Sequence, residues 1–372
     1  MKAENTNMNI PELSVNDVIG ELLDMYDGAI GGRIPFRCLP SPFLWGPPGI
    51  GKSDAIRQLG EALEEDGDIR VCITDVRLLL FSPVDLRGVP VADVQKQLAV
   101  WLKPAIFQMD PSDNVVNILL LDELSAAPQS VQSAAYQLTL DRRIGEHKLP
   151  ENCIVIAAGN RTTDLSVAYK MPKALANRMM HFNVRSDFAS WKQWAIQNGI
   201  DKRIIGFLSF DNSGLYREPD SSDLAYPTPR SWTFVSTVLR ALGRCYSLET
   251  AHNSIAACVG TDMAVAFETW CQVYEKLPDT DSILGGTCRE YPKTQDVLYA
   301  LSASLLVIVR ERWKILSQTE LENICEYAAR FPADFAMTFF KDLQSIQING
   351  LHLRLMKCRS LQAWLAQNRK YL

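Results

Sequence analysis

The sequence has few of the residues that hold metals or disulfides, and those it has are dispersed. Its nine cysteines stand singly, with no C-x-x-C pair, and none of its four histidines lies in a cluster with them. This spacing argues against a zinc site, and an odd number of cysteines suits reduced thiols better than a disulfide framework. We therefore expect a protein of a reducing compartment, the cytoplasm.

Long hydrophobic runs and a strong charge of one sign are missing as well. Residues 1–13 lack the apolar core of a secretory signal, and the hydrophobic stretch 297–309 is too short to cross a bilayer. We expect that stretch to be a buried helix. The net charge is −5, which argues against broad, non-specific binding of nucleic acid, although it is compatible with a local basic groove.

What remains is the composition of an ordinary globular protein. The chain has 372 residues, of which 47% are hydrophobic and 22% are charged, so we expect two or three domains. It shows no internal repeat and no low-complexity tract. Nothing in these numbers identifies a function, which has to come from local motifs.

The first half of the chain alternates between short apolar runs rich in β-formers and helix-like segments. The predicted strands are 41–46, 69–76, 116–122, 152–159 and 179–184, and the predicted helices are 14–30, 52–63, 127–140 and 172–177. This alternation predicts an α/β fold, a five-stranded parallel sheet with helices on both faces, over residues 1–185. From residue 187 only helical periodicity follows, and we divide this part into a helical domain (186–277) and a C-terminal helical region (278–372).

A glycine-rich turn joins the first predicted strand of this sheet to the next helix. The segment fits the pattern G-x-x-x-x-G-K-[ST] in a strand–loop–helix context, the setting in which such a loop binds phosphate. Its backbone N–H groups can cradle an anion, the lysine can contact the β- and γ-phosphates, and the serine can bind Mg²⁺. A chance glycine-rich turn is the alternative. The residues are Gly46, Pro47, Pro48, Gly49, Ile50, Gly51, Lys52 and Ser53.

Polar residues also end two other predicted strands. Asp122 and Glu123 follow a run of apolar residues, and Asn160 follows another. The carboxyl ends of parallel strands meet at the edge where ligands of such sheets bind. Asp122 can hold Mg²⁺ together with Ser53, Glu123 can polarise an attacking water, and Asn160 can orient that water. Solvated acids, or an asparagine in a left-handed turn, are the alternatives.

Arg230 lies at the start of a predicted helix, in the segment YPTPRSW. Cations prefer the C-terminal end of a helix, so an arginine at the N-terminal end is electrostatically unfavourable unless an anion such as a γ-phosphate is near. A solvated surface charge is the alternative.

Taken together with ALANR (174–178) and PTPRSW (227–232), these motifs resemble the AAA+ ATPases, and among them the MoxR-like group. The resemblance covers about residues 14–242. It implies that Asn160 is sensor 1, that Arg230 is sensor 2 in a helical lid domain, and that Arg178 is an arginine finger that reaches a neighbouring subunit. The family often continues with Arg-Phe at this point, whereas this chain has Arg178-Met179. The rival arginines are Arg142, Arg143 and Arg161.

The same resemblance implies that residues 82–104 are a hairpin inserted in helix 2, for which a long loop is the alternative. It also implies a ring, usually a hexamer, that hydrolyses ATP with Mg²⁺ to remodel or mature a client protein. Relatives often act with a von Willebrand factor A domain protein. No D-x-S-x-S pattern of such a domain occurs in this chain, so that partner would be a separate polypeptide.

Two other functions compete with this one. The first is a nucleic-acid motor or restriction subunit similar to MCM or McrB proteins, the latter using GTP. The second is a nucleotide-gated scaffold without hydrolysis, which the presence of Lys52 and Glu123 disfavours. For the C-terminal region we expect packing on the ring or recruitment of a partner, with its aromatic side chains forming a core. These aromatic residues are Trp313, Phe331, Phe335, Phe339, Phe340 and Trp364.

Overall fold

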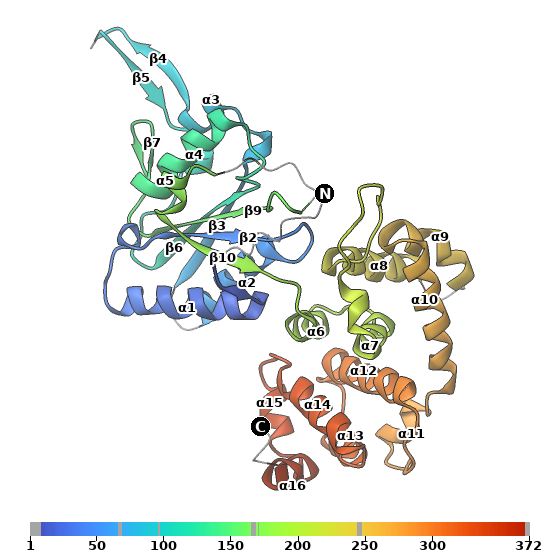
Figure 1. The fold of residues 1–372 in the computed structure, drawn as a ribbon. Coiled ribbons are helices and arrows are strands. Elements are labelled where there is room, and N and C mark those ends of the chain that lie inside the picture. Colours follow the sequence, from blue (N-terminus) through green and yellow to red (C-terminus); the bar gives the residue numbers. More distant parts are fainter. Residues whose placement is uncertain are drawn as a thin grey trace. The chain divides into compact units, whose positions relative to one another are not determined.

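The chain folds into two compact units, residues 1–186 and 187–372. The computed structural model describes residues 9–65, 69–95, 97–164, 169, 171–243 and 248–368, and of residues 174, 175, 248, 249 and 275 it describes the backbone alone. Figure 1 shows an α/β first unit and a helical second unit. Each is described by itself.

The first unit is built on a parallel sheet of six strands in the order β1-β10-β2-β9-β6-β3. The five predicted strands are all present, and the two-residue β1 adds a sixth because it pairs with Asn183 and Val184 of β10 at the edge. The bounds are β1 (Glu12–Leu13), β2 (Ser41–Trp45), β3 (Arg70–Arg77), β6 (Val115–Asp122), β9 (Cys153–Gly159) and β10 (Met179–Val184).

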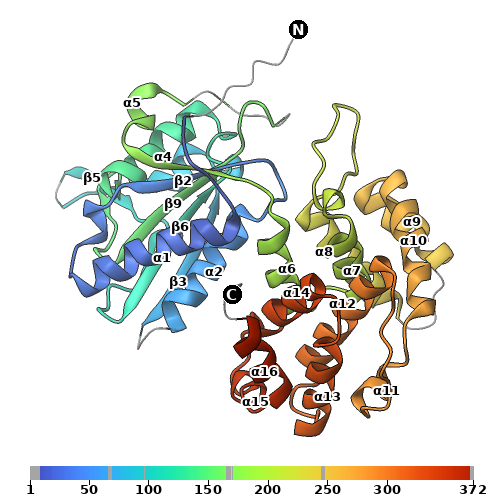
Figure 2. The same ribbon diagram turned by 60° about the horizontal axis from the view of Figure 1, so that its bottom comes forward.

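Helices cover both faces of this sheet (Figures 1 and 2). On one face lie α1 (Val15–Gly31) and α2 (Lys52–Glu65), and on the other α4 (Gln129–Asp141). The side chains of β6 alternate between the faces: Leu119 and Leu121 pack in one core with Val131 and Leu138 of α4. Every residue from Val115 to Leu121 is buried, and all of them except Asn117 are apolar, as expected for a central parallel strand. Short 3₁₀ turns lie at Phe36–Cys38, Leu78–Leu80 and Ala105–Phe107.

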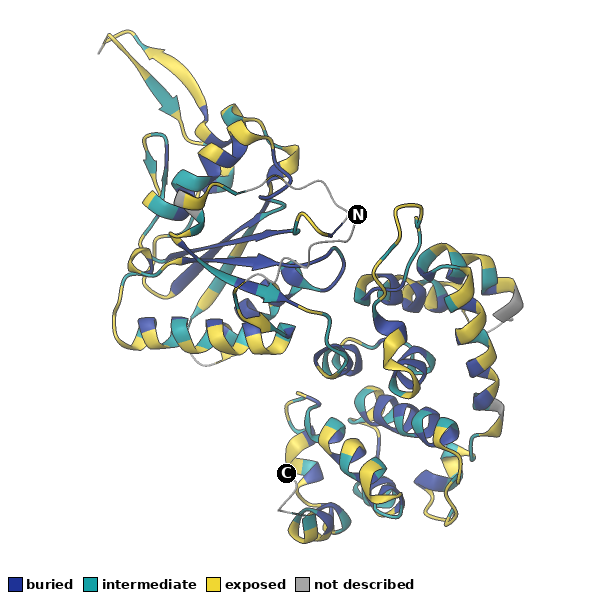
Figure 3. Ribbon diagram, in the orientation of Figure 1, coloured by how far each residue is buried: buried dark blue, intermediate teal, exposed yellow. Residues whose placement is uncertain are grey.

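A β-hairpin rises from this unit between β3 and β6. The short helix α3 (Pro83–Arg87) leads into β4 (Val89–Asp93), which pairs antiparallel with β5 (Leu98–Leu102). Within the segment 82–104, β4 and β5 therefore form a hairpin, and its identity as the insert of helix 2 stays a prediction. Figure 3 shows β4 and β5 largely exposed, whereas the central strands are buried. A smaller hairpin, β7 (Arg143–Ile144) and β8 (His147–Lys148), follows α4.

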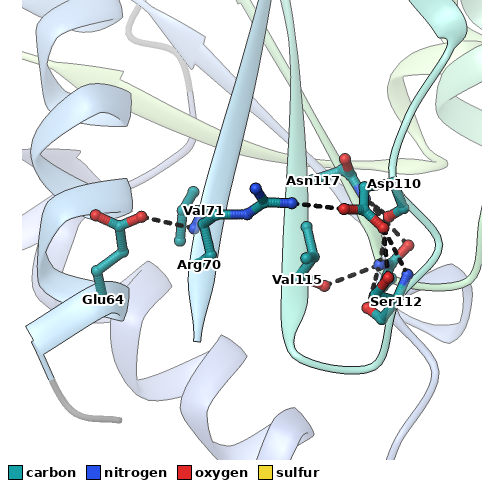
Figure 4. Close-up of polar contacts among 8 residues, drawn as sticks. Glu64, Arg70, Val71, Asp110, Ser112, Val115 and Asn117 are labelled. Atoms are coloured by element: carbon teal, nitrogen blue, oxygen red, sulfur yellow. Dashed lines mark hydrogen bonds and ion pairs between the residues drawn. The ribbon is translucent and has the colours of Figure 1, made fainter. Parts of the chain in front are cut away.

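The amino ends of the strands are tied together by a polar cluster (Figure 4). Arg70, at the start of β3, forms an ion pair with Asp110 at 2.5 Å. Asn117 donates a hydrogen bond to the Asp110 carbonyl at 2.7 Å, and Asn152 donates to the Val115 carbonyl at 2.8 Å. Because buried amides need partners, these bonds fix the strands at the edge opposite to their carboxyl ends.

The second unit contains only helices among its described residues. The hydrophobic stretch 297–309 lies in α12, most of whose residues are buried, and α12 packs on α7, so the prediction of a buried helix is confirmed. No helix in the described ranges has the length and apolar character that crossing a bilayer requires. The helices are α6 (Phe188–Gln197), α7 (Lys202–Phe210), α8 (Pro229–Leu242), α9 (Leu248–Val259), α10 (Thr261–Cys271), α11 (Thr280–Leu284), α12 (Gln295–Arg312), α13 (Gln318–Ala328), α14 (Ala333–Gln344), α15 (Leu351–Leu355) and α16 (Arg359–Asn368), with 3₁₀ turns at Asn212–Leu215 and Gln272–Lys276.

One hydrophobic core extends from Trp191 to Trp364 in this unit. The six aromatic residues predicted to form a core lie in it or pack against it. The division of the helical part at residue 277 stays a prediction. Cys245 lies outside the described residues.

Candidate nucleotide-binding site

The glycine-rich loop connects β2 directly to α2. Three of its residues, Gly46, Gly49 and Gly51, have positive φ angles of 152°, 81° and 106°. A side chain at Gly46 would bring a Cβ within 2.6 Å of the Val184 carbonyl oxygen, so the loop can begin beside β10 only with glycine there. Ile50 is buried, and a Cβ on Gly46 would also come within 2.7 Å of its Cδ1. The loop therefore has the backbone freedom that an anion-binding turn requires.

Lys52 is the first residue of α2, and its side chain turns back into the loop. The ammonium group donates to the carbonyls of Gly46 and Pro47 at 2.6 and 2.9 Å and to Asn160 Oδ1 at 3.0 Å. Only 8% of Lys52 is exposed. A buried charge of this kind needs partners, and here two backbone oxygens and one amide oxygen supply them. The contact with Asn160 brings together two predicted site residues that are 108 positions apart.

Ser53 and Asp122 form the second link across the site. The serine hydroxyl donates to Asp122 Oδ2 at 2.6 Å. Asp122 Oδ1 accepts from the Glu123 backbone N–H at 2.8 Å. Both side chains carry hard oxygen atoms, the ligands that Mg²⁺ prefers. The predicted metal-binding pair is therefore assembled by the fold.

Glu123 begins the turn after β6 in an unusual backbone conformation. Its φ angle is 57°, in the left-handed region that residues other than glycine rarely adopt. Its carbonyl accepts from the N–H groups of Ala126 and Ala127, which holds the turn. The half-buried carboxylate has no hydrogen-bond partner among the described residues. Backbone strain of about 1–3 kcal/mol tends to persist at functional sites, where it aims a side chain.

Asn160 is held by a residue that the sequence reasoning missed, Ser125. The Ser125 hydroxyl accepts from the Asn160 backbone N–H at 2.9 Å, and a Cβ on Gly159 would lie 2.6 Å from the same oxygen. Behind it, Gln132 donates to the Ser125 carbonyl at 3.3 Å. Ser125 stands two positions after Glu123, but no sequence pattern distinguishes it from an ordinary turn serine.

The four candidate trans-acting arginines differ sharply in their surroundings. Arg142 is half-buried and donates to Ser41 Oγ at 2.5 Å and to the Leu39 carbonyl at 3.0 Å, and burial lowers the pKa of its guanidinium. Arg143 folds back on the Gly145 carbonyl at 2.8 Å. Arg161 forms an ion pair with Asp164 at 2.8 Å. Arg178 is exposed and has no side-chain partner among the described residues.

Arg178 follows the short helix α5 (Lys173–Ala176) and precedes β10 directly. Within the predicted motif 174–178, the side chains of residues 174 and 175 lie outside the described residues. Arg230 is the second residue of α8, at the predicted helix start, where Thr228 caps the helix by accepting from the Ser231 N–H at 3.0 Å. It is exposed and belongs to the second unit, so its role at the site stays a prediction.

Comparison with known proteins gives a family for this part of the chain. Residues 42–181 match the family described as ATPase family associated with various cellular activities (AAA). None of the curated proteins is significantly similar to the chain.

Solved structures are similar over most of the chain but only distantly. One is a putative ATPase from Cytophaga hutchinsonii, with 13% identity, a TM-score of 0.34, and 96% of this chain and 93% of that one covered. Another is Aeropyrum pernix ORC2 in ADPNP–ADP complexes, with 14% identity, a TM-score of 0.39 and 97% of each chain covered. A third is a mutant form of Thermotoga maritima RuvB, with 16% identity, a TM-score of 0.36, and 83% of this chain and 89% of that one covered.

These TM-scores are too low for an argument, so the assignment rests on the family match together with the site. The matched segment contains the glycine-rich loop, the paired acids and Asn160. Residues 42–181 therefore match the AAA ATPases, and the chain is an ATP-hydrolysing enzyme.

Proposed function

We propose that this chain is a Mg²⁺-dependent ATPase of the MoxR-like group, cytoplasmic, whose copies assemble into a ring and remodel or mature a client protein. One observation carries the nucleotide part of the proposal. Lys52 contacts Asn160, and Ser53 contacts Asp122, so the loop, the paired acids and the neighbouring strand end converge at one edge of the sheet. Ligands of open α/β sheets bind at that edge.

The residues present fit a triphosphate with Mg²⁺. The loop offers backbone N–H groups at positive-φ glycines, and α2 begins at Lys52, so its positive N-terminal end faces the same place. The Lys52 ammonium group donates hydrogen bonds to three oxygen atoms. Oxygen atoms of the β- and γ-phosphates would take the place of these acceptors. Ser53 and Asp122 would hold the metal, which neutralises charge on the phosphates when it is bound.

Three residues of the chain have separate roles in hydrolysis. Glu123 accepts a proton from the attacking water, because its carboxylate is half-buried and has no competing partner among the described residues. Asn160 orients that water through its side-chain amide while Ser125 fixes its backbone at 2.9 Å. Lys52 stabilises the charge that develops on the transferred phosphoryl group.

Arg178 is the best candidate for a residue acting on a neighbouring subunit. It is exposed and has no side-chain partner among the described residues, whereas Arg142 and Arg161 would first have to break half-buried contacts. An arginine offers a fixed charge on a planar fork, and a finger of this type contributes about 10³–10⁵ to the rate. We assign Arg230 the second sensor role, in the helical unit.

The client is the part of the proposal that stands on resemblance alone. We propose a protein client, together with a separate von Willebrand factor A domain protein as partner. The exposed hairpin β4–β5, with Val94 85% exposed, is a surface of this chain that can meet another protein.

Two measurements test the proposal. Sedimentation of the purified chain with ATP and Mg²⁺ should show a ring, and phosphate release should require both. The Glu123→Gln variant with ATP is then used as bait, with Lys52→Ala as the control that cannot hold nucleotide. A von Willebrand A protein retained by the first variant alone supports the proposal. Salt-sensitive DNA binding that stimulates hydrolysis would instead favour a nucleic-acid motor.

A further inference from the structure

His181 lies in β10 and is bonded to a neighbouring strand through its side chain. In the parallel pair β10–β2, His181 stands opposite Phe43. Its Nδ1 accepts a hydrogen bond from Trp45 Nε1 at 2.9 Å. The Trp45 ring stacks on Phe43 at 4.0 Å, and the His181 ring lies 6.0 Å from Trp45. The imidazole is thus one member of a packed aromatic group at the carboxyl end of β2.

The second nitrogen of the same ring bonds in the opposite direction. An indole N–H can only donate, so Nδ1 of His181 carries no proton and the neutral ring carries its hydrogen on Nε2. Nε2 then donates to the Ala176 carbonyl at 2.8 Å. One tautomer satisfies both contacts, and the ring bridges β2 to the last residue of α5.

Each end of this bridge leads to a predicted site residue. Trp45 is followed by Gly46, whose carbonyl accepts from the Lys52 ammonium at 2.6 Å. In the sequence, Arg178 lies between Ala176, the last residue of α5, and Met179, the first residue of β10. The backbone on either side of Arg178 is therefore tied down, by the His181–Ala176 bond before it and by the sheet after it.

We propose that His181 is a positioning residue, which holds Arg178 in place for the neighbouring subunit and couples it to the phosphate loop of its own chain. This rests on the trans-acting role of Arg178 proposed above. Arg178 has no side-chain partner among the described residues, so its reach depends on the backbone that carries it. Because a displacement of about 1 Å can cost about 10²-fold in rate, the tie matters for catalysis and not for nucleotide binding.

The test compares three substitutions in the full chain. His181→Phe keeps a flat ring but removes both hydrogen bonds, and we expect kcat to fall about ten- to a hundredfold with KM for ATP unchanged. Trp45→Phe removes only the indole N–H that donates to His181 Nδ1, and we expect kcat to fall in the same way. His181→Gln keeps a donor and an acceptor and should retain clearly more activity than His181→Phe. His352→Phe, at an exposed histidine of α15, is the matched control and should leave kcat unchanged.

A double-mutant cycle identifies the residue through which His181 acts. In an Arg178→Ala background, His181→Phe should lower kcat by less than about twofold, because the positioned side chain is already gone. An equal loss in both backgrounds, or wild-type kcat for His181→Phe, would overturn the inference alone. Wild-type kcat for Arg178→Ala would overturn the trans-acting role itself, and this inference with it. Loss of ATP binding in both His181→Phe and Trp45→Phe would also overturn the inference, because the tie would then support the nucleotide site and not Arg178.

Discussion

The Ser53 hydroxyl donates a hydrogen bond to Asp122 Oδ2 at 2.6 Å, which joins the first turn of α2 to the last residue of β6. If this pair holds Mg²⁺, Ser53→Ala should raise the Mg²⁺ concentration for half-maximal ATP hydrolysis at least about tenfold, since bonds to charged groups contribute about 1.5–3 kcal/mol. Measuring ATPase activity over a range of Mg²⁺ concentrations gives this half-maximal concentration for both proteins. Ser133→Ala, on an exposed turn of α4, is the control and should not shift the titration.

Glu123→Gln should keep ATP binding and lose hydrolysis by about 10²–10⁴-fold, because the amide has the shape of the carboxylate but cannot take a proton. Calorimetric titration with ATP measures the binding, and phosphate release measures the turnover. The matched control is Glu151→Gln, at an exposed acid that pairs with Arg37 at 2.6 Å. Normal turnover by Glu123→Gln would mean that another group activates the water.

Mixing two inactive variants tests whether Arg178 acts in trans. Rings made of Arg178→Ala and Lys52→Ala together should recover part of the wild-type ATPase activity, because an intact arginine can meet an intact loop across some interfaces. The ratio of the two proteins is varied and activity is followed. Without recovery at any ratio, Arg143 or a monomeric enzyme becomes the better explanation.

Gly88, at the base of the exposed hairpin, should be irreplaceable by alanine. Its φ angle is 88°, and a Cβ there would lie 1.9 Å from the Leu102 carbonyl oxygen. Gly88→Ala should therefore cost more than about 2 kcal/mol of unfolding free energy or force the hairpin to shift. Gly145→Ala is the matched control, since φ is 54° there but the space around it is open, and about 1–2 kcal/mol is expected. Denaturant unfolding compares the two.

The cysteines should differ in their reaction with an alkylating agent. Burial raises the pKa of the Cys153 thiol and of the Cys271 thiol to about 12 each. At pH 8 both stay protonated, and the thiolate is the reactive form. Cys38 is exposed. Iodoacetamide at pH 8 should label Cys38 in the folded protein and reach Cys153 and Cys271 only after denaturant is added, which peptide mass spectrometry can follow. Labelling of Cys153 without denaturant would contradict the burial described above.

Local patterns were enough to predict most of the first unit. The strand ending at Asp122 has four apolar residues in a row from Ile118 to Leu121, because a central parallel strand is buried on both faces. The turn from Gly46 to Ser53 could be predicted because its glycines, at fixed spacing, permit the positive φ angles that this turn needs. The two-residue β1 was missed, because a short edge strand is defined by its partner and has no periodicity of its own.

The sequence by itself determined the parallel sheet, the glycine-rich loop and the paired acids, since neighbouring residues specify each of them through hydrophobic period, glycine spacing and charge. Only the tertiary structure decided which arginine is exposed and which side chains stand behind the site. Arg142 and Ser41 are 101 positions apart, and Trp45 and His181 are 136 apart, so their contacts exist only once the strands have assembled. Burial and hydrogen bonding of this kind depend on the whole fold, and no local pattern records them.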